Sequence, residues 1–213
     1  MQLVPADTSV FPKYDLESLG QELSLFKIWF VNQLLGSELK STDEDMLKEI
    51  YGVPTENALC QPQGIVHRDF HSRNIMLTRS KELALIDYQD AVIGPITYDL
   101  VSLLKDCYIS WPREMVISRA LNFKLRLQAK MIIENVEDQA FIRWFDLMGL
   151  QRHIKVLGIF SRLALRDNKS DYLKDLPLVV DYVMDVSMRY SDTLVFGNWF
   201  KRTIYPKFVN QNF

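Results

Sequence analysis

Cysteine is scarce in this sequence of 213 residues, which contains only two cysteines. Cys60 and Cys107 lie far apart and form no C-x-x-C pair, so the sequence indicates neither a disulfide framework nor a cysteine-based zinc site. Two unpaired thiols are typical of a protein from a reducing compartment. We therefore expect both cysteines to be free.

An excess of charge of one sign is also absent, because 25 Lys and Arg face 27 Asp and Glu, for a formal net charge of −2. This balance gives no electrostatic reason to expect a nucleic acid or an anionic membrane surface as a partner. No run approaches the roughly 18 consecutive apolar residues of a membrane span, and the start, MQLVPADTSVFPKYD, lacks the pattern of a signal peptide. We therefore expect a cytoplasmic protein that holds any anionic ligand locally, by a metal or a few placed donors.

Helical periodicity dominates the sequence, which is 48% hydrophobic and long enough to bury a core. Apolar residues recur at intervals of three and four over residues 15–35, just before Gly36, and predict an amphipathic helix. A shorter helix is predicted over residues 41–52, and a loop at Pro54. Beyond Pro112 the same periodicity predicts several helices almost to the end of the chain.

Short β-strands are predicted only in the middle of the chain. The runs GIVH, NIMLT and ELALIDY are rich in Ile, Val and Leu, and the charged RSK between the last two predicts a small hairpin. Gly94 and Pro95 are expected to end this region, and the run TYDLVSLLKDCYI resumes helical spacing. Helices around one β ribbon make no alternating βαβ pattern, so the predicted fold class is mainly α with a small β ribbon (α+β).

The polar loop between the first two of these runs has the spacing of a catalytic loop. In HRDFHSRN, residues 67–74, the His, Arg, Asp and Asn match the H-R-D-φ-x-x-x-N signature of kinases, and Asp87 follows thirteen residues after Asn74. Phosphoryl transfer requires a carboxylate in line with the γ-phosphate, and an amide oxygen and a second carboxylate that hold Mg²⁺. A loop and the strand after it can present Asp69, Asn74 and Asp87 on one side.

A purely structural role is the alternative, because Asp and Asn often stabilise turns. The order of the neighbouring segments favours the catalytic interpretation. A strand precedes the motif, a strand follows it, and LALID and a helix that starts at YDL come next.

Three stretches extend the match beyond the loop: QPQGIVHRDFHSRNIM, LIDYQDAVIGPITYDLVSLLKDCY and LQRHIKVLGIFSRLA. The region from Gln61 to Pro112 resembles the aminoglycoside-phosphotransferase-like kinases, a family with the protein-kinase fold. Within that family, the three stretches are most similar to the bacterial anomeric sugar kinases that phosphorylate N-acetylmuramate and N-acetylglucosamine at C1 in cell-wall recycling. The resemblance covers about a third of the chain in the same order.

The resemblance implies ATP as the phosphoryl donor, Mg²⁺ as the cofactor and an amino sugar as the acceptor. Carried over residue by residue, it implies that Asp69 is the catalytic base. It also implies that Asn74 and Asp87 bind Mg²⁺ and, through it, the nucleotide. Two alternatives remain open: another acceptor, such as an aminoglycoside or a choline-like alcohol, and a non-catalytic module that binds a partner protein.

Four further residues are implied to act within or beside the loop. Asp99, in YDL, resembles the helix-start aspartate that holds the catalytic loop by hydrogen bonds. His67 and Arg68 are expected to brace the loop. His71 lies where this family often carries a histidine, and it either contacts the transferring phosphate as a catalytic residue or packs against its neighbours.

Three residues are candidates for substrate contact, namely Arg73, Asp90 and Arg152. Arg73 has bracing of the acidic cluster as its alternative role, and Asp90 has a turn. For Arg152 the alternative is a solvated basic helix face that it shares with His153 and Lys155.

The resemblance divides the chain into a linker, residues 1–14, and a kinase-like C-terminal lobe, residues 15–213. Within the lobe it implies a catalytic loop at 65–78, a metal-binding strand at 83–90 and a helical subdomain at 96–213. The 66 residues before His67 contain neither the Gly-rich loop nor the V-A-I-K-like strand that kinases carry in a small N-terminal lobe.

Three explanations compete for the missing lobe: the sequence is a fragment, a second chain supplies the lobe, or catalysis has been lost. We expect the first, because a pure binding module has no need of a base and metal ligands in register. ATP would have only one wall of its cleft, so we expect the chain alone to have little or no activity.

Overall fold

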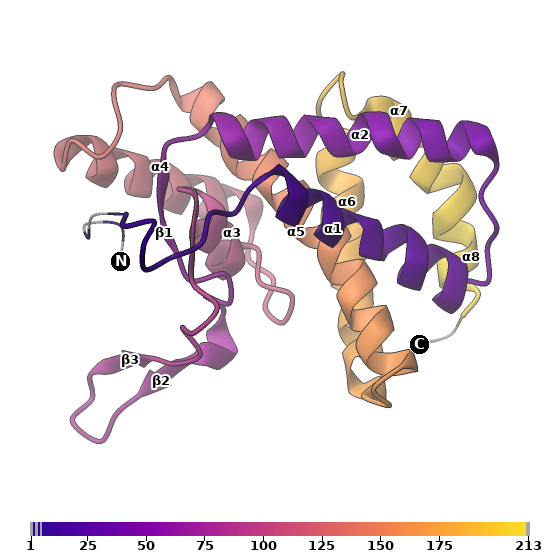
Figure 1. Cartoon of the computed structure of the whole chain (residues 1–213), viewed down its shortest axis with the longest axis horizontal. Coiled ribbons are helices and arrows are strands. Elements are labelled where there is room, and N and C mark those ends of the chain that lie inside the picture. The colour runs from indigo at the N-terminus through magenta and orange to yellow at the C-terminus, as the bar shows by residue number, and fades with distance from the viewer. Residues whose placement is uncertain (1, 3, 5, 212–213) are drawn as a thin grey trace. The chain divides into compact units, whose positions relative to one another are not determined.

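The chain folds mainly into helices, as the computed structural model shows for residues 2, 4 and 6–211 (Figure 1). Two antiparallel sheets of two strands each complete this described part. The predicted class, mainly α with a small β ribbon, is therefore confirmed. The chain divides into two compact units, the first formed by Met1–Asp15 and Asn57–Gly149 and the second by Leu16–Glu56 and Leu150–Phe213.

The helices have the following bounds in chain order. They are α1 (Leu16–Leu25), the π-helix η1 (Phe26–Leu34), α2 (Ser41–Cys60), the 3-10 turn η2 (Ser72–Asn74), α3 (Tyr98–Leu104), α4 (Arg113–Ala129), α5 (Asp138–Leu165), the 3-10 helix η3 (Ser170–Asp175), α6 (Leu176–Ser187), α7 (Leu194–Trp199), the π-helix η4 (Phe200–Ile204) and α8 (Tyr205–Val209). Among residues 2, 4 and 6–211, no helix is both long enough and apolar enough to cross a membrane. Neither Cys60 nor Cys107 forms a disulfide bond.

The first predicted helix is present but changes geometry along its length. It starts at Leu16 as α1 and continues from Phe26 as the π-helix η1. Gly36 follows with a φ of +56°, a left-handed conformation that glycine adopts without steric cost and that often ends a helix.

The second predicted helix is longer than the sequence indicated. We expected an end at Gly52, but α2 continues through Pro54 and ends at Cys60. Pro54, Thr55 and Ala58 are buried in this added part of the helix. Their burial outweighs the backbone hydrogen bond that a proline removes from a helix interior.

The β-structure of the first unit contains one strand that the sequence did not indicate. Strand β1 (Gln63–Val66) pairs in antiparallel register with β4 (Val92–Pro95), where we expected Gly94 and Pro95 to break the chain. Pro95 is tolerated because it is the last residue of its strand. Gly94 packs so tightly that a Cβ there would lie 3.2 Å from the Cβ of Tyr14.

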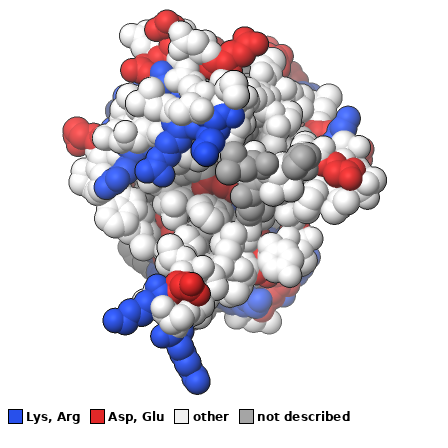
Figure 2. Space-filling view, turned by 90° about the vertical axis from the view of Figure 1, so that its left-hand side faces the viewer, with Lys and Arg blue, Asp and Glu red and all other residues white. Residues whose placement is uncertain are grey.

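The predicted hairpin is confirmed. Strands β2 (Ile75–Leu77) and β3 (Leu83–Leu85) pair in antiparallel register and project from the rest of the first unit (Figure 1). The face of the molecule in Figure 2 carries both acidic and basic side chains.

A cluster of phenylalanine side chains forms the core of the second unit. The ring of Phe26 lies 5.5 Å from that of Phe30 and 6.1 Å from that of Phe200, and Phe196 packs beside them. All four side chains are fully or almost fully buried. Helix α5 approaches α1 closely at Gly158, where an added Cβ would lie 2.4 Å from the carbonyl carbon of Leu25.

An ion cluster joins the segment after α3 to helices α4 and α5 inside the first unit. The buried carboxylate of Asp146 accepts hydrogen bonds from Lys105 at 3.1 Å and from Arg113 at 3.1 and 2.8 Å. Burial raises the pKa of Asp146, but the hydrogen bond from Arg113 and the charges of Lys105 and Arg113 outweigh burial. The pKa therefore lies below its ordinary value.

The contact at Gly158 predicts the effect of an added methyl group. We expect Gly158→Ala to lower the free energy of unfolding by about 1–3 kcal/mol, because the new Cβ overlaps the backbone of Leu25. Gly20→Ala in α1 is the control, since no atom lies within 4 Å of its added Cβ. The control should raise the stability by up to about 1 kcal/mol. Urea unfolding measures both, and equal stabilities for the two variants would contradict the close approach of α5 to α1.

The ion cluster predicts a stability difference that depends on pH. We expect Asp146→Asn to lower the free energy of unfolding by about 3–5 kcal/mol at neutral pH, because Lys105 is then buried without a counter-charge. The folded-state pKa of Asp146 lies below its unfolded-state value of about 3.9, so its ionisation stabilises the fold above that value. This stabilisation disappears as the pH falls through the folded-state pKa. Urea unfolding from pH 7 to pH 3 should show the two proteins converging, and a difference that stays constant would exclude this role of Asp146.

Candidate active site

The segment His67–Asn74 leaves the end of β1 and folds back on itself before β2. The backbone carbonyl of Asp69 accepts hydrogen bonds from the amide of His71 and from the side-chain nitrogen of Asn74, both at 3.0 Å. The amide of Asn74 in turn donates to the carbonyl of His71 at 3.0 Å. The structure therefore brings together the predicted base, Asp69, and the predicted metal ligand, Asn74.

Asp99 holds the start of this loop. It lies in the first turn of α3 with 9% of its surface exposed, and its two carboxylate oxygens accept the backbone N–H groups of His67 at 2.8 Å and Arg68 at 3.1 Å. Arg68 has a φ of 72°, a left-handed conformation that is costly for a residue with a side chain. The two charge-assisted hydrogen bonds stabilise that conformation.

His67 and Arg68 also make side-chain contacts that brace the loop. The His67 ring is fully buried, and its Nε2 lies 3.0 Å from the backbone oxygen of Ile86. Because a carbonyl oxygen only accepts, Nε2 carries the proton in this hydrogen bond. The guanidinium of Arg68 lies 5.6 Å from the ring centre of Tyr14. The contact of His67 ties the loop to the residue just before Asp87.

A backbone hydrogen bond also connects the residue before Asp87 to Asn74. The amide of Ile86 donates to the backbone oxygen of Asn74 at 3.2 Å, which extends the pairing of β2 and β3. Asp87 then takes a φ of 68°, and one of its carboxylate oxygens accepts a hydrogen bond from Gln89 at 2.7 Å. The strand expected at 83–90 is shorter in the structure, because β3 stops at Leu85, before Asp87, and Leu83 is 78% exposed.

The donor set of Asn74 and Asp87 fits a magnesium ion. The Asn74 side-chain nitrogen donates a hydrogen bond to the Asp69 carbonyl, and no described residue donates to the Asn74 side-chain oxygen. In the described part of the chain, no three His, Cys, Asp or Glu side chains gather into a metal cage. Mg²⁺ is usually bound by one or two carboxylates together with substrate phosphates, so a site completed by a nucleotide requires no such cage.

His71 and Arg73 both contact one aromatic ring. The ring of His71 meets Tyr108 edge to face at 5.5 Å, and the guanidinium of Arg73 lies 3.4 Å from the centre of the same ring. Asp90 lies in an exposed turn after Asp87. The roles of these three predicted residues toward substrate stay predictions.

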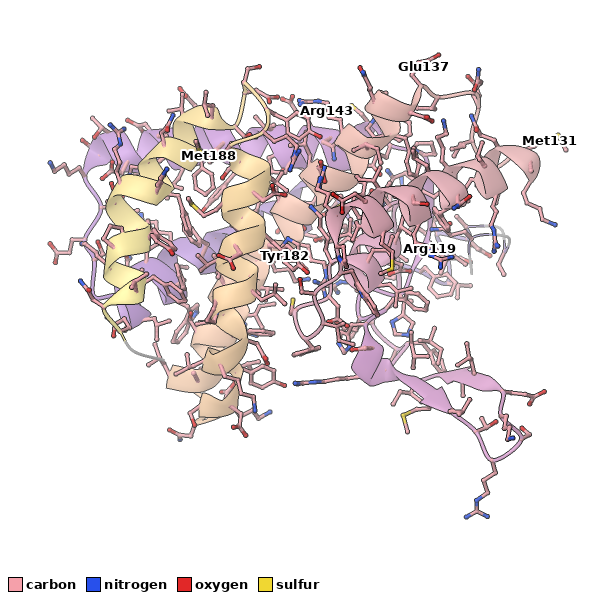
Figure 3. All side chains as sticks on the ribbon, turned by 180° about the vertical axis from the view of Figure 1, so that it is seen from behind. Arg119, Met131, Glu137, Arg143, Tyr182 and Met188 are labelled. Carbon is pink, nitrogen blue, oxygen red and sulfur yellow. The ribbon has the colours of Figure 1, made fainter. Side chains whose placement is uncertain are left out.

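The alternative role considered for Arg152, a solvated basic face on helix α5, is wrong. Arg152, His153 and Lys155 are 5%, 0% and 9% exposed. Lys155 forms an ion pair with Glu22 at 2.7 Å, and the ring of His153 stacks on that of Tyr182 at 4.7 Å; Figure 3 labels Tyr182 on α6. Helix α5 is buried around most of its circumference, so His153 and Lys155 contact partners inside the second unit. Contact between Arg152 and substrate stays a prediction.

Sequence reasoning overlooked two residues that touch the loop, Asp106 and Tyr108. The carboxylate of Asp106 accepts the backbone N–H groups of Ser72 at 2.9 Å and of Tyr108 at 3.1 Å. The available signal was the run KDCY, in which a carboxylate and an aromatic residue directly follow the helix that starts at YDL.

This arrangement defines a class of protein. A loop H-R-D-x-x-x-x-N, held by a helix-start aspartate and paired with a second segment that leads to an aspartate, is the arrangement that is typical of kinase-type phosphotransferases. The model of the phosphotransferase enzyme family, APH, matches residues 1–131. The chain belongs to this family.

Curated relatives extend the similarity over most of the chain. It is 41% identical over 183 residues to the N-acetylmuramate/N-acetylglucosamine kinase of Neisseria meningitidis serogroup B, covering 86% of this chain and 54% of that protein. Proteins of the same name from Pseudomonas putida and Pseudomonas aeruginosa are 37% and 42% identical, over 92% and 82% of this chain and 57% and 51% of their own lengths. The chain thus spans about half the length of the curated relatives that it matches.

The contacts of Asp99 predict how the loop responds to loss of one carboxylate oxygen. We expect Asp99→Asn to accelerate hydrogen exchange at the amides of His67 or Arg68 by roughly tenfold or more, because an amide group can accept from only one of them. Exchange measured by NMR or mass spectrometry tests this. Asp90→Asn, which changes an exposed turn nearby, is the control and should leave both amides unchanged. Identical exchange in the two variants would show that Asp99 does not hold the loop.

Proposed function

We propose that the chain carries the catalytic loop and the metal ligands of a Mg²⁺-dependent phosphotransferase. In the proposed reaction, the γ-phosphoryl group of ATP is transferred to a hydroxyl of a small molecule, namely the anomeric hydroxyl of an amino sugar. The observation that carries the proposal is a pair of hydrogen bonds. One joins the Asn74 side chain to the Asp69 carbonyl, and the other joins the Asn74 backbone to Ile86, the residue before Asp87. The name of the relatives, N-acetylmuramate/N-acetylglucosamine kinase, supports the acceptor. The proposal assigns the reaction to the cytoplasm, where ATP is available.

Asp69 is the proposed catalytic base. Its backbone carbonyl is fixed by two hydrogen bonds from within the loop, whereas no described residue donates to its half-buried carboxylate. A carboxylate placed in this way can accept the proton of an acceptor hydroxyl as the hydroxyl oxygen attacks phosphorus. The rigid backbone keeps the carboxylate in line with the attacking group.

Asn74 and Asp87 are the proposed metal ligands. Their side-chain oxygens would hold Mg²⁺, which supplies positive charge to the phosphate oxygens during transfer. The hydrogen bond from Asn74 to the Asp69 carbonyl links the orientation of this ligand to that of the base. We propose that Arg73 and His71 contact phosphate oxygens, and that Asp90 and Arg152 contact the acceptor.

The first unit presents apolar surface that a further part of the enzyme would cover. The exposed fractions of Met76, Leu77 and Leu83, on the β2–β3 ribbon, are 49%, 68% and 78%. An apolar cavity of about 490 Å³ lies beside the loop, and Phe70 and Leu85 are among its lining residues. Exposed apolar side chains that gather on one part of a surface are typical of an interaction site. We propose that a kinase N-terminal lobe, from a longer form of the chain or from a second chain, covers the ribbon.

Phosphotransfer can be tested directly as Mg²⁺-dependent consumption of ATP with N-acetylmuramate and N-acetylglucosamine. The assay compares this chain with a form extended upstream by its reading frame. We expect the extended form to turn over and this chain alone to show little activity, because the proposed N-terminal lobe would supply the second wall of the nucleotide cleft. Asp69→Ala should lower the turnover of the active form at least roughly 100-fold.

Asp171→Asn is the matched control, since Asp171 is exposed in the second unit and should leave turnover unchanged. If neither form consumes ATP with either sugar, the proposed acceptor is wrong. If Asp69→Ala retains full turnover, Asp69 is not the base.

A further inference from the structure

We propose that Asp106 and Tyr108 are positioning residues that fix the second half of the catalytic loop and the direction of Arg73 and His71. The catalytic consequence rests on the proposed function, but the structural part does not. Neither residue belongs to the H-R-D-x-x-x-x-N signature or to the metal-binding segment. Both lie in the short segment between α3 and α4, on the first unit.

Asp106 caps the turn that carries Asn74. The 3-10 turn Ser72–Asn74 begins after His71, whose side chain makes no capping hydrogen bond. The first N–H of the turn, that of Ser72, is instead accepted by Asp106 from 34 residues further along the chain. A carboxylate at the start of a helical turn stabilises it both as an acceptor and by its charge.

The carboxylate of Asp106 is buried, and burial of a charged group costs free energy unless hydrogen bonds replace its hydration. Its exposed fraction is 1%, and within the described part of the chain it forms no ion pair. A buried carboxylate is tolerated only where hydrogen bonds satisfy its oxygens. Here one oxygen accepts from Ser72 and the other from Tyr108, so both oxygens are used on backbone groups.

Asp106 therefore complements Asp99 on the other side of the base. Asp99, at the start of α3, fixes the amides of residues 67 and 68, and Asp106, just beyond the end of α3, fixes that of Ser72. Asp69 lies between the two fixed points. Lys105, which precedes Asp106, is anchored by its buried ion pair with Asp146, so this second support is itself held in place.

The ring of Tyr108 contacts two side chains of the loop, those of His71 and Arg73. The backbone N–H of Tyr108 is held by Asp106, and its ring contacts His71 at 5.5 Å and Arg73 at 3.4 Å. A guanidinium that stacks on an aromatic ring uses its face and keeps its N–H groups at the edge for an anion. The exposed Arg73 is thereby oriented for phosphate oxygens before a nucleotide binds.

Hydrogen exchange and NMR test the structural part on this chain without any activity. Asp106→Asn should accelerate exchange at the Ser72 amide at least roughly tenfold, because the amide group cannot accept from both N–H partners. The side-chain resonances of Arg73 should be shifted upfield by the Tyr108 ring. The shift should persist in Tyr108→Phe, which keeps the ring, and disappear in Tyr108→Leu. Unchanged exchange at Ser72 in Asp106→Asn would overturn the proposal. If Asp106→Asn proves unstable, an Arg73 shift that survives in Tyr108→Leu would still overturn it.

A double-mutant cycle on the active form tests the catalytic consequence. Tyr108→Leu should lower kcat/KM roughly tenfold, Tyr108→Phe should restore most of the loss, and Tyr108→Leu should cost little in an Arg73→Ala background. A merely structural role would make the two losses additive, and additivity would sink the positioning role. If no form turns over, the proposed function fails, while exchange and NMR still decide whether Asp106 and Tyr108 hold the loop.

Discussion

Hydrogen bonds from backbone N–H groups to two buried carboxylates determine the shape of the catalytic loop. Asp99 accepts those of His67 and Arg68, and Asp106 accepts that of Ser72. Asp99 lies in the first turn of the short helix α3 and Asp106 lies two residues beyond its end, so this part of the chain holds the loop at two points. A left-handed residue such as Arg68 can persist only where its surroundings hold it, and these carboxylates supply that constraint.

The remaining parts of the site depend on this loop. Asn74 is oriented by the backbone of Asp69, and Asn74 in turn pairs with the residue before Asp87. His67 reaches the same segment through the carbonyl of Ile86. The proposed base and the proposed metal ligands are thus parts of one hydrogen-bonded unit. Displacement of one of these residues would therefore displace the others, and phosphoryl transfer depends on their positions.

The chain belongs to an enzyme family, and part of the surface beside the loop is apolar. The β2–β3 ribbon exposes apolar side chains, and the chain spans about half the length of its curated relatives. The proposed N-terminal lobe would add the remainder of a nucleotide cleft to a loop whose backbone is already held by hydrogen bonds. Pre-organisation of this kind lowers the cost of assembling the complete site.

The sequence by itself determined the class of the fold, the hairpin of β2 and β3 and the motif that identifies the loop, because these depend on local periodicity and spacing. Only the tertiary structure decided the continuation of α2 past Pro54, the pairing of β4 and the burial of Arg152. It also decided the contacts of Asp106 and Tyr108. Each of these outcomes is set by a partner far along the chain, and burial or a distant hydrogen bond overrides the local preference of Pro, Gly or a charged side chain.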